Sequence, residues 1–399
     1  MSPTAEPRLA HRITSEAEAL EIAAELAVRF TPRGAEIDEA GTLPLDIVDE
    51  FSASGLWAIT VPKEFGGLGA STATLVEVIA RISAADPSLG QIPQNHFCLV
   101  EDVLLSGTAE QQEFFFSLAL SGARFANAFS EAGGKTAAEI QTKIEPAGDG
   151  YVVNGRKFYA TGTEYAHWIP VLAVDPDGKE LLAFAPRDAE GLHVVGDWDA
   201  FGQRATASGS VVLTDLRIPA ERVFPMYREY ENPTVAGPLA QITTAAIDLG
   251  IGRGAFAATL EAVRSSRPWI DANIDSATQD PLTLNELGRL DIDLAAADAL
   301  LQQAAHVLDA AKAEPTEASV AAASVAVARA KVLTTEVSLA AGSKLNELGG
   351  TRSVVGGRRL DRFWRNARVH TLHDPVRWKF NLVGNYVLNG TFPARHSWN

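Results

Sequence analysis

Apolar residues recur at helical spacing through the first third of the chain. Ile22, Leu26 and Phe30 fall on one face of a helix, and Ser15 and Glu18 have the spacing of an N-terminal capping box. Similar patterns continue from residue 44 to about 122, interrupted by the glycine-rich segment PKEFGGLGAS. We therefore predict an N-terminal α-helical domain over residues 1–124.

The pattern changes between about residues 140 and 220 to short runs of β-branched and aromatic residues. These runs are separated by Asp149-Gly150, Asn154-Gly155 and Asp177-Gly178, which are dipeptides typical of hairpin turns. The pattern predicts a small middle domain of antiparallel β-strands, which we assign to residues 125–235.

Helical periodicity returns near residue 236, and the helices are longer. One is expected from Leu239 to Val263, a second around the leucines of residues 284–301, and a third in the alanine-rich segment that ends at Gly349-Gly350. A fourth should start near Arg359. Four long helices with short connections indicate a four-helix bundle over residues 236–399. The predicted fold class is therefore α+β multidomain: helical, then β, then helical.

Composition narrows the possible partners. The 399 residues are 46% hydrophobic and carry a net charge of −16, which disfavours nucleic acid and anionic membrane surfaces. A single cysteine, Cys98, excludes a disulfide framework. The N-terminus lacks the apolar segment of a signal peptide, and charged residues interrupt the alanine-rich run at 317–341. We expect a soluble cytoplasmic protein.

Two histidines near the C-terminus are candidates for chemistry. His370 and His373 would share a face if both were helical, and Asp374 and Pro375 follow directly. A metal would need a third protein ligand, and the other histidines form no second paired motif, so we predict no metal site. The alternative without chemistry is that the pair only packs or caps the last helices.

Glycine-rich and hydroxyl-bearing segments are further candidates for ligand binding. GIGRGAF (250–256) and FGGLGAS (65–71) do not follow a strand in a βαβ unit, so the chain is not expected to bind a nicotinamide cofactor itself. In FANAFSEAGG and GRKFYATG, the side chains of Asn127, Ser130 and Thr161 could hydrogen-bond the polar edge of a planar ring. They could equally be ordinary turn residues.

A family resemblance covers residues from about 16 to 390. FSEAGG, YVVNGRKFYATGTEYAHWIPVLAV and FGQRATASGSVVLTDLRIPAERV resemble the middle domain of the acyl-CoA dehydrogenase superfamily. ELGGTRSVVGGRRLDRFWRNARVHTLHDP resembles its C-terminal end. The resemblance implies a flavin between the last two domains, normally in a homotetramer. It places near the cofactor a set of residues from both domains: Asn127, Phe129, Ser130, Tyr159, Thr161, Arg264, Arg267, Arg352 and Asp374.

The chain departs from the dehydrogenase pattern at two places. Asp374 stands where these enzymes commonly carry a glutamate base, but it is one methylene shorter and Pro375 follows it. Arg352 enters the segment that handles the diphosphate or adenosine part of FAD, and a guanidinium suits a terminal phosphate. We therefore expect FMN, taken up as FMNH2, with FAD as the alternative.

LHDPVRWKFNLVGNYVLNG is similar to the C-terminus of the reduced-flavin-dependent monooxygenases of this superfamily, which include dibenzothiophene monooxygenase and SfnB-type sulfur-acquisition oxidoreductases. The resemblance implies a two-component enzyme that uses O2, through a flavin C4a-(hydro)peroxide, on a small organosulfur or heteroaromatic substrate. A separate NAD(P)H:flavin reductase would supply FMNH2. His96, His370 and His373 would be the catalytic residues, with His96 facing the other two. The alternatives are an FAD-dependent acyl-CoA dehydrogenase with Asp374 as base, and a non-catalytic flavin-binding oligomer.

Overall fold

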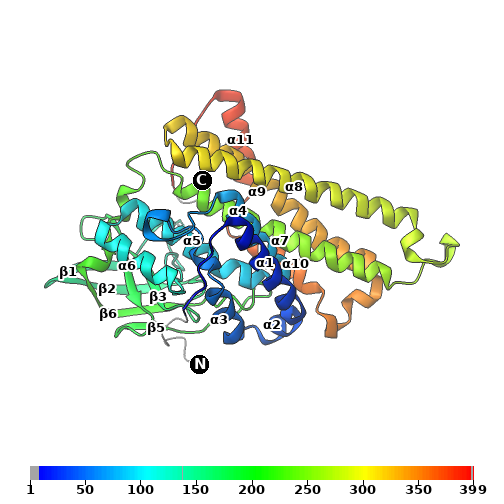
Figure 1. Cartoon of the computed structure of the whole chain (residues 1–399), viewed down its shortest axis with the longest axis horizontal. Coiled ribbons are helices and arrows are strands. Elements are labelled where there is room, and N and C mark those ends of the chain that lie inside the picture. Colours follow the sequence, from blue (N-terminus) through cyan, green and yellow to red (C-terminus); the bar gives the residue numbers. More distant parts are fainter. Residues whose placement is uncertain (1–8, 137, 397–398) are drawn as a thin grey trace.

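The computed structural model describes residues 9–136, 138–396 and 399. A β-sheet forms one end of the molecule and a bundle of long helices extends from it, with the N-terminal helices packed against both (Figure 1). The order of helical, β and helical regions is the one that the sequence predicts.

From residue 9 onward, where the description of the chain begins, the N-terminal region contains six α-helices. They are α1 (Glu16–Phe30), α2 (Gly34–Ala40), α3 (Leu45–Ala53), α4 (Thr72–Ala85), α5 (Pro87–Ser106) and α6 (Ala109–Leu120). The Ser15 hydroxyl caps α1 by accepting from the Glu18 amide. The Glu18 carboxylate accepts from the amide of Thr14 rather than that of Ser15, so the predicted helix is confirmed but only half of the capping box forms.

The middle region is one seven-stranded sheet in the order β5-β6-β2-β1-β3-β4-β7. Its strands are β1 (Lys143–Ala147), β2 (Gly150–Lys157), β3 (Trp168–Val174), β4 (Glu180–Pro186), β5 (Leu192–Val194), β6 (Val211–Pro219) and β7 (Val223–Phe224). All neighbouring strands are antiparallel except β1 and β3. The sheet is therefore mixed rather than purely antiparallel, because the chain crosses from β2 past β1 before it starts β3.

Two of the three predicted hairpins are correct. Residues 148–149 join Ala147 to its partner Gly150 in the β1–β2 hairpin, and Asp177-Gly178 lies between β3 and β4. Asn154-Gly155 was a wrong prediction, since it lies inside β2 at an irregularity in the pairing with β6. Glycine is needed there because a Cβ on Gly155 would lie only 2.4 Å from Oγ1 of Thr142.

The C-terminal region contains α7 (Ala236–Arg264), α8 (Pro281–Ala313), α9 (Glu317–Gly349), the short α10 (Asp361–His370) and α11 (Arg377–Asn389). The GIGRGAF segment lies in α7, where a Cβ on Gly250 would come within 2.4 Å of the Ala80 carbonyl oxygen of α4. Its glycines thus permit close helix packing. α9 is long and apolar enough to span a membrane, but 67% of its most apolar window is buried inside the protein. We interpret α9 as the core helix of the bundle.

Candidate active site

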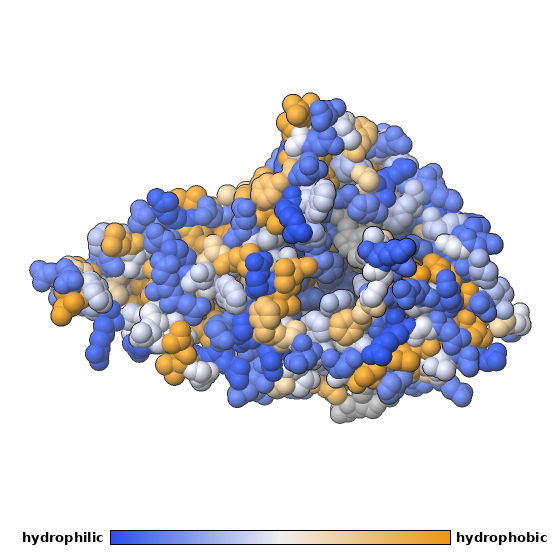
Figure 2. Space-filling model, turned by 180° about the vertical axis from the view of Figure 1, so that it is seen from behind, coloured by the Kyte–Doolittle hydropathy of each residue, from blue (hydrophilic) through white to orange (hydrophobic). Residues whose placement is uncertain are grey.

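A cavity of about 130 Å³ lies where the N-terminal helices, the sheet and the bundle meet. Its walls come from α5, from the loop before β1, from the N-terminal end of α7 and from the turn after α10. Seen from behind, the molecule is hollowed beneath the projecting end that carries α11 (Figure 2). The lining residues are Gln94, Asn95, Cys98, Asp102, Asn127, Phe129, Ser130, Ile140, Leu172, Met226, Tyr230, Ala236, Ala240, Gln241 and His373.

α5 contributes one face to this cavity. Gln94, Cys98 and Asp102 are spaced four residues apart and therefore lie along one side of the helix, with Asn95 beside them. His96 points elsewhere. Its side chain is 0% exposed, and its ring packs against Trp57 and Phe125, with ring centroids 5.2 and 4.7 Å away.

The predicted placement of His96 opposite the other two histidines was therefore wrong. Its Nδ1 accepts a hydrogen bond from the Phe125 amide at 3.1 Å, and the backbone of Trp57 is a second polar neighbour of the ring. Burial lowers the pKa of His96 to about 3, so the ring is neutral. The helical period explains the difference, because residue 96 is rotated by about 200° from residue 94 on the cavity face.

The loop from Asn127 to Ser130 forms the sheet side of the cavity. Asn127 Oδ1 accepts from the Phe129 amide at 2.9 Å, and the Ser130 carbonyl accepts from the Phe158 amide at 3.0 Å. Among the described residues, neither the Ser130 hydroxyl nor Asn127 Nδ2 makes a hydrogen bond. The backbone of this loop is thus fixed while two polar groups remain available to a ligand.

A buried ion pair braces this loop from inside the sheet. Lys157 Nζ, with a fully buried side chain, lies 2.6 Å from Glu131 Oε1 and 3.0 Å from the Phe129 carbonyl oxygen. Glu131 also accepts from the amides of Gln141 and Thr142. Burial raises and these partners lower the pKa of Glu131, with a net lowering that keeps the carboxylate charged.

Thr161 and Tyr159 lie next to the cavity but outside its walls. The buried Thr161 hydroxyl is 2.8 Å from that of Ser208, which continues to Thr206 at 2.7 Å. Tyr159 is 54% exposed and has a backbone φ of 58°. Such a conformation is uncommon for a bulky residue and concentrates at functional sites. Its exposed ring is therefore available to a planar cofactor.

His370 lies beneath the cavity, inside the bundle. Its Nδ1 is 2.5 Å from Asp248 Oδ1 on α7, and the other Asp248 oxygen accepts from Lys331 Nζ at 3.2 Å and Thr335 Oγ1 at 3.1 Å on α9. Burial lowers the pKa of His370, although Asp248 acts in the opposite direction. His370 therefore belongs to a buried polar network and does not line the cavity.

His373 does reach the cavity. α10 ends at His370, so His373 stands on the following turn, and its side chain is 46% exposed. Nδ1 lies 3.5 Å from Oδ1 of Asp374, whose other oxygen is 3.6 Å from Lys379 Nζ. Burial would raise the pKa of Asp374, but His373, Lys331 and Lys379 together hold it well below its usual value. Asp374 is thus a charged residue that can orient His373.

The three arginines that were predicted to lie near the cofactor, Arg264, Arg267 and Arg352, lie far from these groups. Arg264 ends α7, and Arg352 follows α9 and donates to the Ser265 carbonyl. At 1.5 Å per residue, the 24 residues from Ala240 to Arg264 span about 36 Å. Within one chain, one flavin mononucleotide cannot contact both Ser130 and these exposed arginines, Arg267 included.

Several residues of this region were not predicted from the sequence. They are Gln94, Asn95, Asp102, Tyr230 and Gln241 on the cavity wall, Lys157 and Glu131 behind the loop, and Asp248 and Lys331 in the bundle. One signal in the sequence could have identified Asp248 and Lys331, since each is a charged residue inside an apolar helical pattern. Charged side chains are almost never buried unless they are paired. Within the described residues, no group of three or more His, Cys, Asp or Glu side chains could hold a metal ion.

Comparison with known proteins identifies the fold family. Three acyl-CoA dehydrogenase domain models match: the N-terminal domain over residues 15–123, the middle domain over 126–216 and the C-terminal domain over 242–378. The chain belongs to the acyl-CoA dehydrogenase family.

Relatives define its branch more narrowly. Dibenzothiophene monooxygenase of Mycolicibacterium goodii is 33% identical over 94% of both chains, and the probable FMNH2-dependent monooxygenase SfnC of Pseudomonas putida is 31% identical over 94% of this chain and 96% of its own. The structure of TdsC from Paenibacillus sp. A11-2 with FMN and indole superimposes with a TM-score of 0.91 at 33% identity, covering 96% of this chain and 99% of TdsC. The protein is a flavin-dependent monooxygenase, and neither predicted alternative is favoured.

Proposed function

We propose that the protein is the oxygenase of a two-component system, which uses FMNH2 and O2 to oxygenate a small organosulfur or heteroaromatic substrate. The observation that carries this proposal is the position of His373 on the wall of the cavity, opposite α5 and next to the available polar groups of Asn127 and Ser130. An imidazole has both a donor and an acceptor nitrogen and can transfer a proton to or from a group bound beside it.

The residues around the cavity fit a flavin. Ser130 and Asn127 offer hydrogen-bonding groups for the polar edge of its ring, and the exposed aromatic ring of Tyr159 offers an apolar face. When bound, reduced FMN supplies the electrons that activate O2. The protein then has to orient the substrate, hold a proton at His373 and exclude water, which the apolar walls formed by Phe129, Ile140 and Leu172 promote.

The geometry argues against Asp374 as a dehydrogenase base. The side chain is buried between His373 and Lys379, and its low pKa makes it a weak proton acceptor. A base must also reach the proton that it abstracts, and Asp374 is not among the residues that line the cavity. Its role in the proposal is to orient the His373 ring from below.

The proposal is tested by mixing the protein with photoreduced FMN under anaerobic conditions and then adding O2 and a panel of sulfides, sulfoxides and thiophenes. We expect oxygenated product and little hydrogen peroxide. Reoxidation at the rate of free FMN without product would contradict the proposal. An acyl-CoA added without O2 should leave oxidised bound FMN unbleached; bleaching would instead favour the dehydrogenase alternative.

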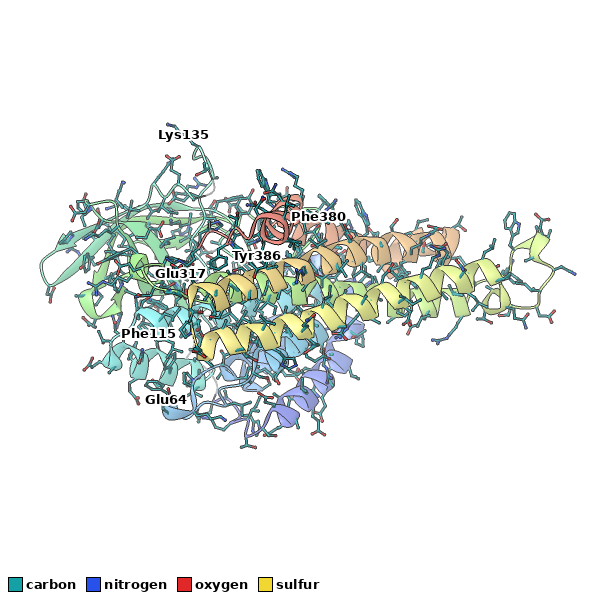
Figure 3. The ribbon with its side chains drawn as sticks, turned by 90° about the horizontal axis from the view of Figure 1, so that it is seen from above. Glu64, Phe115, Lys135, Glu317, Phe380 and Tyr386 are labelled. Atoms are coloured by element: carbon teal, nitrogen blue, oxygen red, sulfur yellow. The ribbon has the colours of Figure 1, made fainter. Side chains whose placement is uncertain are left out.

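A homotetramer is part of the proposal. α11 lies over α9 and carries Phe380 and Tyr386 (Figure 3). Its surface exposes a set of large apolar side chains, Trp378, Phe380, Val387 and Leu388, and such patches mark interaction sites. We propose that Arg264, Arg267 and Arg352 of a second copy contact the phosphate of a flavin held by Ser130. We further propose a cytoplasmic location, where a separate NAD(P)H:flavin reductase supplies FMNH2.

The assembly is tested by analytical ultracentrifugation of a Val387→Glu/Leu388→Glu variant. We expect species smaller than a tetramer and weaker FMN binding. Val28→Glu is the matched control, because Val28 is an exposed residue of α1 away from this patch. A wild-type protein that sediments as a monomer while binding FMN would refute the shared site.

A further inference from the structure

Asp102 is an unpartnered acid on the cavity wall. Its side chain is 6% exposed, and it makes no hydrogen bond or ion pair with any described residue. Gln241 faces the same cavity from α7, and its buried Oε1 also has no hydrogen-bond partner within the described part of the chain. Buried polar groups are normally hydrogen-bonded. Two such groups on one cavity wall indicate that a ligand completes their hydrogen bonds.

The charged surroundings of Asp102 are acidic. Glu101 lies next to it on α5, and Glu229 follows β7, with Ser106 as its hydrogen-bond donor. Lys312 on α8 is paired with Glu101. The remaining titratable neighbours are Cys98, Tyr230, Glu180 and, across the cavity, His373.

Burial raises the pKa of two carboxyl groups here. Burial, and then the negative charges of Glu229 and Glu101, raise the pKa of Asp102 well above its ordinary value. Burial raises the pKa of Glu229 to about 8. A protonated carboxyl donates one hydrogen bond and still accepts others. Among the described residues that line the cavity, there is no lysine or arginine that could neutralise an anion.

We propose that Asp102 and Gln241 are specificity-determining residues that select a compact, neutral substrate bearing a hydrogen-bond acceptor, such as a sulfoxide oxygen, and reject the corresponding sulfinate anion. Asp102 donates to the acceptor atom, and rotation of the Gln241 amide places Nε2, in exchange for the unpartnered Oε1, where it donates a second hydrogen bond to that atom. The cavity volume of about 130 Å³ is below the 300–1,000 Å³ typical of sites for drug-sized ligands, which favours a compact molecule. This inference rests on the proposed function, since it names the substrate class of the same cavity.

The test is calorimetric titration of the protein with oxidised FMN bound, which requires no turnover. Methyl phenyl sulfide, methyl phenyl sulfoxide and benzenesulfinate serve as probes because they share one ring and differ in the polar group. We expect the sulfoxide to bind about fivefold more tightly than the sulfide, the effect of one net hydrogen bond, and the sulfinate to bind most weakly.

Two variants of Asp102 assign the effect. Asp102→Leu should abolish the preference for the sulfoxide, whereas Asp102→Asn keeps a donor and should retain it. An unchanged preference in Asp102→Leu, or tight wild-type binding of benzenesulfinate, would overturn the inference. If Asp102→Leu does not fold, the pH dependence of sulfoxide binding tests the inference instead. Wild-type affinity for the sulfoxide should fall as rising pH ionises Asp102, and Asp102→Asn should not show this fall, so identical profiles would refute the inference.

The outcomes separate this inference from the proposed function. Binding that depends on Asp102, with no oxygenated product from FMNH2 and O2, would refute the oxygenase and leave the recognition role standing. Oxygenated product with binding that is indifferent to Asp102 would refute the recognition role alone.

Discussion

His370 Nδ1 lies 2.5 Å from Asp248 Oδ1, with side chains that are 1% and 0% exposed. The contact joins α10 to α7, and Lys331 extends it to α9. Three helices of the bundle are thus connected by one carboxylate, directly beneath the turn that carries His373. The network fixes the end of α10, and so the position from which His373 reaches the cavity.

Replacing this carboxylate should destabilise the fold. Asp248→Asn leaves Lys331 and His370 buried without their charged partner, and we expect a loss of about 3–5 kcal/mol in the free energy of unfolding. Chemical denaturation measures this loss. The control is Glu50→Gln, which breaks the exposed Arg29–Glu50 pair and should cost less than about 1 kcal/mol. Equal losses in the two variants would mean that the buried network is not a major stabilising element.

Removing the imidazole at position 373 should uncouple the reaction. His373→Ala changes a half-exposed turn residue, so stability should hold, while product formation falls by about 10²-fold or more and hydrogen peroxide release rises. The yield of product per FMNH2 consumed is the measurement. His193→Ala, at an exposed position on β5, is the matched control and should match the wild type. Normal coupling in His373→Ala would exclude the residue from proton transfer.

His96 should act on stability rather than on chemistry. His96→Leu removes the acceptor of the Phe125 amide and should destabilise the protein by roughly 1–3 kcal/mol at neutral pH. The pKa of His96 is about 3 in the folded protein and near 6.5 when unfolded. Between these values the unfolded chain binds a proton that the folded chain does not, so wild-type stability falls with falling pH.

The pH dependence gives the control for this prediction. The stability difference between wild type and His96→Leu should shrink by at most about 1.4 kcal/mol per pH unit as pH drops below 6.5. Parallel pH profiles, together with lost oxygenation in a stable variant, would restore the catalytic role that the sequence suggested for His96.

The ion pair behind the Asn127–Ser130 loop should support cofactor binding. Lys157→Met leaves Glu131 buried without its partner and frees the Phe129 carbonyl oxygen, so the loop loses its support. We expect the dissociation constant for FMN to rise by about tenfold or more, a loss of about 1.4 kcal/mol. Fluorescence titration of FMN measures it. Arg156→Met changes the exposed neighbour on the same strand and should leave affinity unchanged; a similar loss in both would point to general damage to β2.

The sequence predicts the order of domains because the periods of apolar residues differ so clearly between helices and strands. It also identifies the residues that bound the cavity from the loop and the turn, Asn127, Ser130 and His373. The flavin cofactor was predicted from the family resemblance and not from the periodicity of apolar residues. Asn154-Gly155 misled because a turn-forming dipeptide also suits an irregularity in a strand, and only the approach of Thr142 distinguishes the two.

The remaining errors concern the direction of side chains. Whether position 95 or 96 faces the cavity depends on the rotation of α5 about its axis, which is set by packing across domains. Lys157 meets Glu131, and Asp248 meets Lys331, at sequence separations of 26 and 83 residues. No local pattern encodes such partners. Their common trait is a charge within an apolar stretch, which signals burial without naming the partner.

The end of α10 at His370 gives two imidazoles, three positions apart, separate environments. His370 is buried among helices, whereas His373 lies on a turn that is exposed to solvent and to the cavity. Substitutions in the turn can therefore shift the His373 ring without loosening the bundle, whereas changes in the buried network affect both the stability of the bundle and the position of the turn. Enzymes with this arrangement can evolve to accept new substrates through substitutions in one short turn, while the supporting helices stay the same.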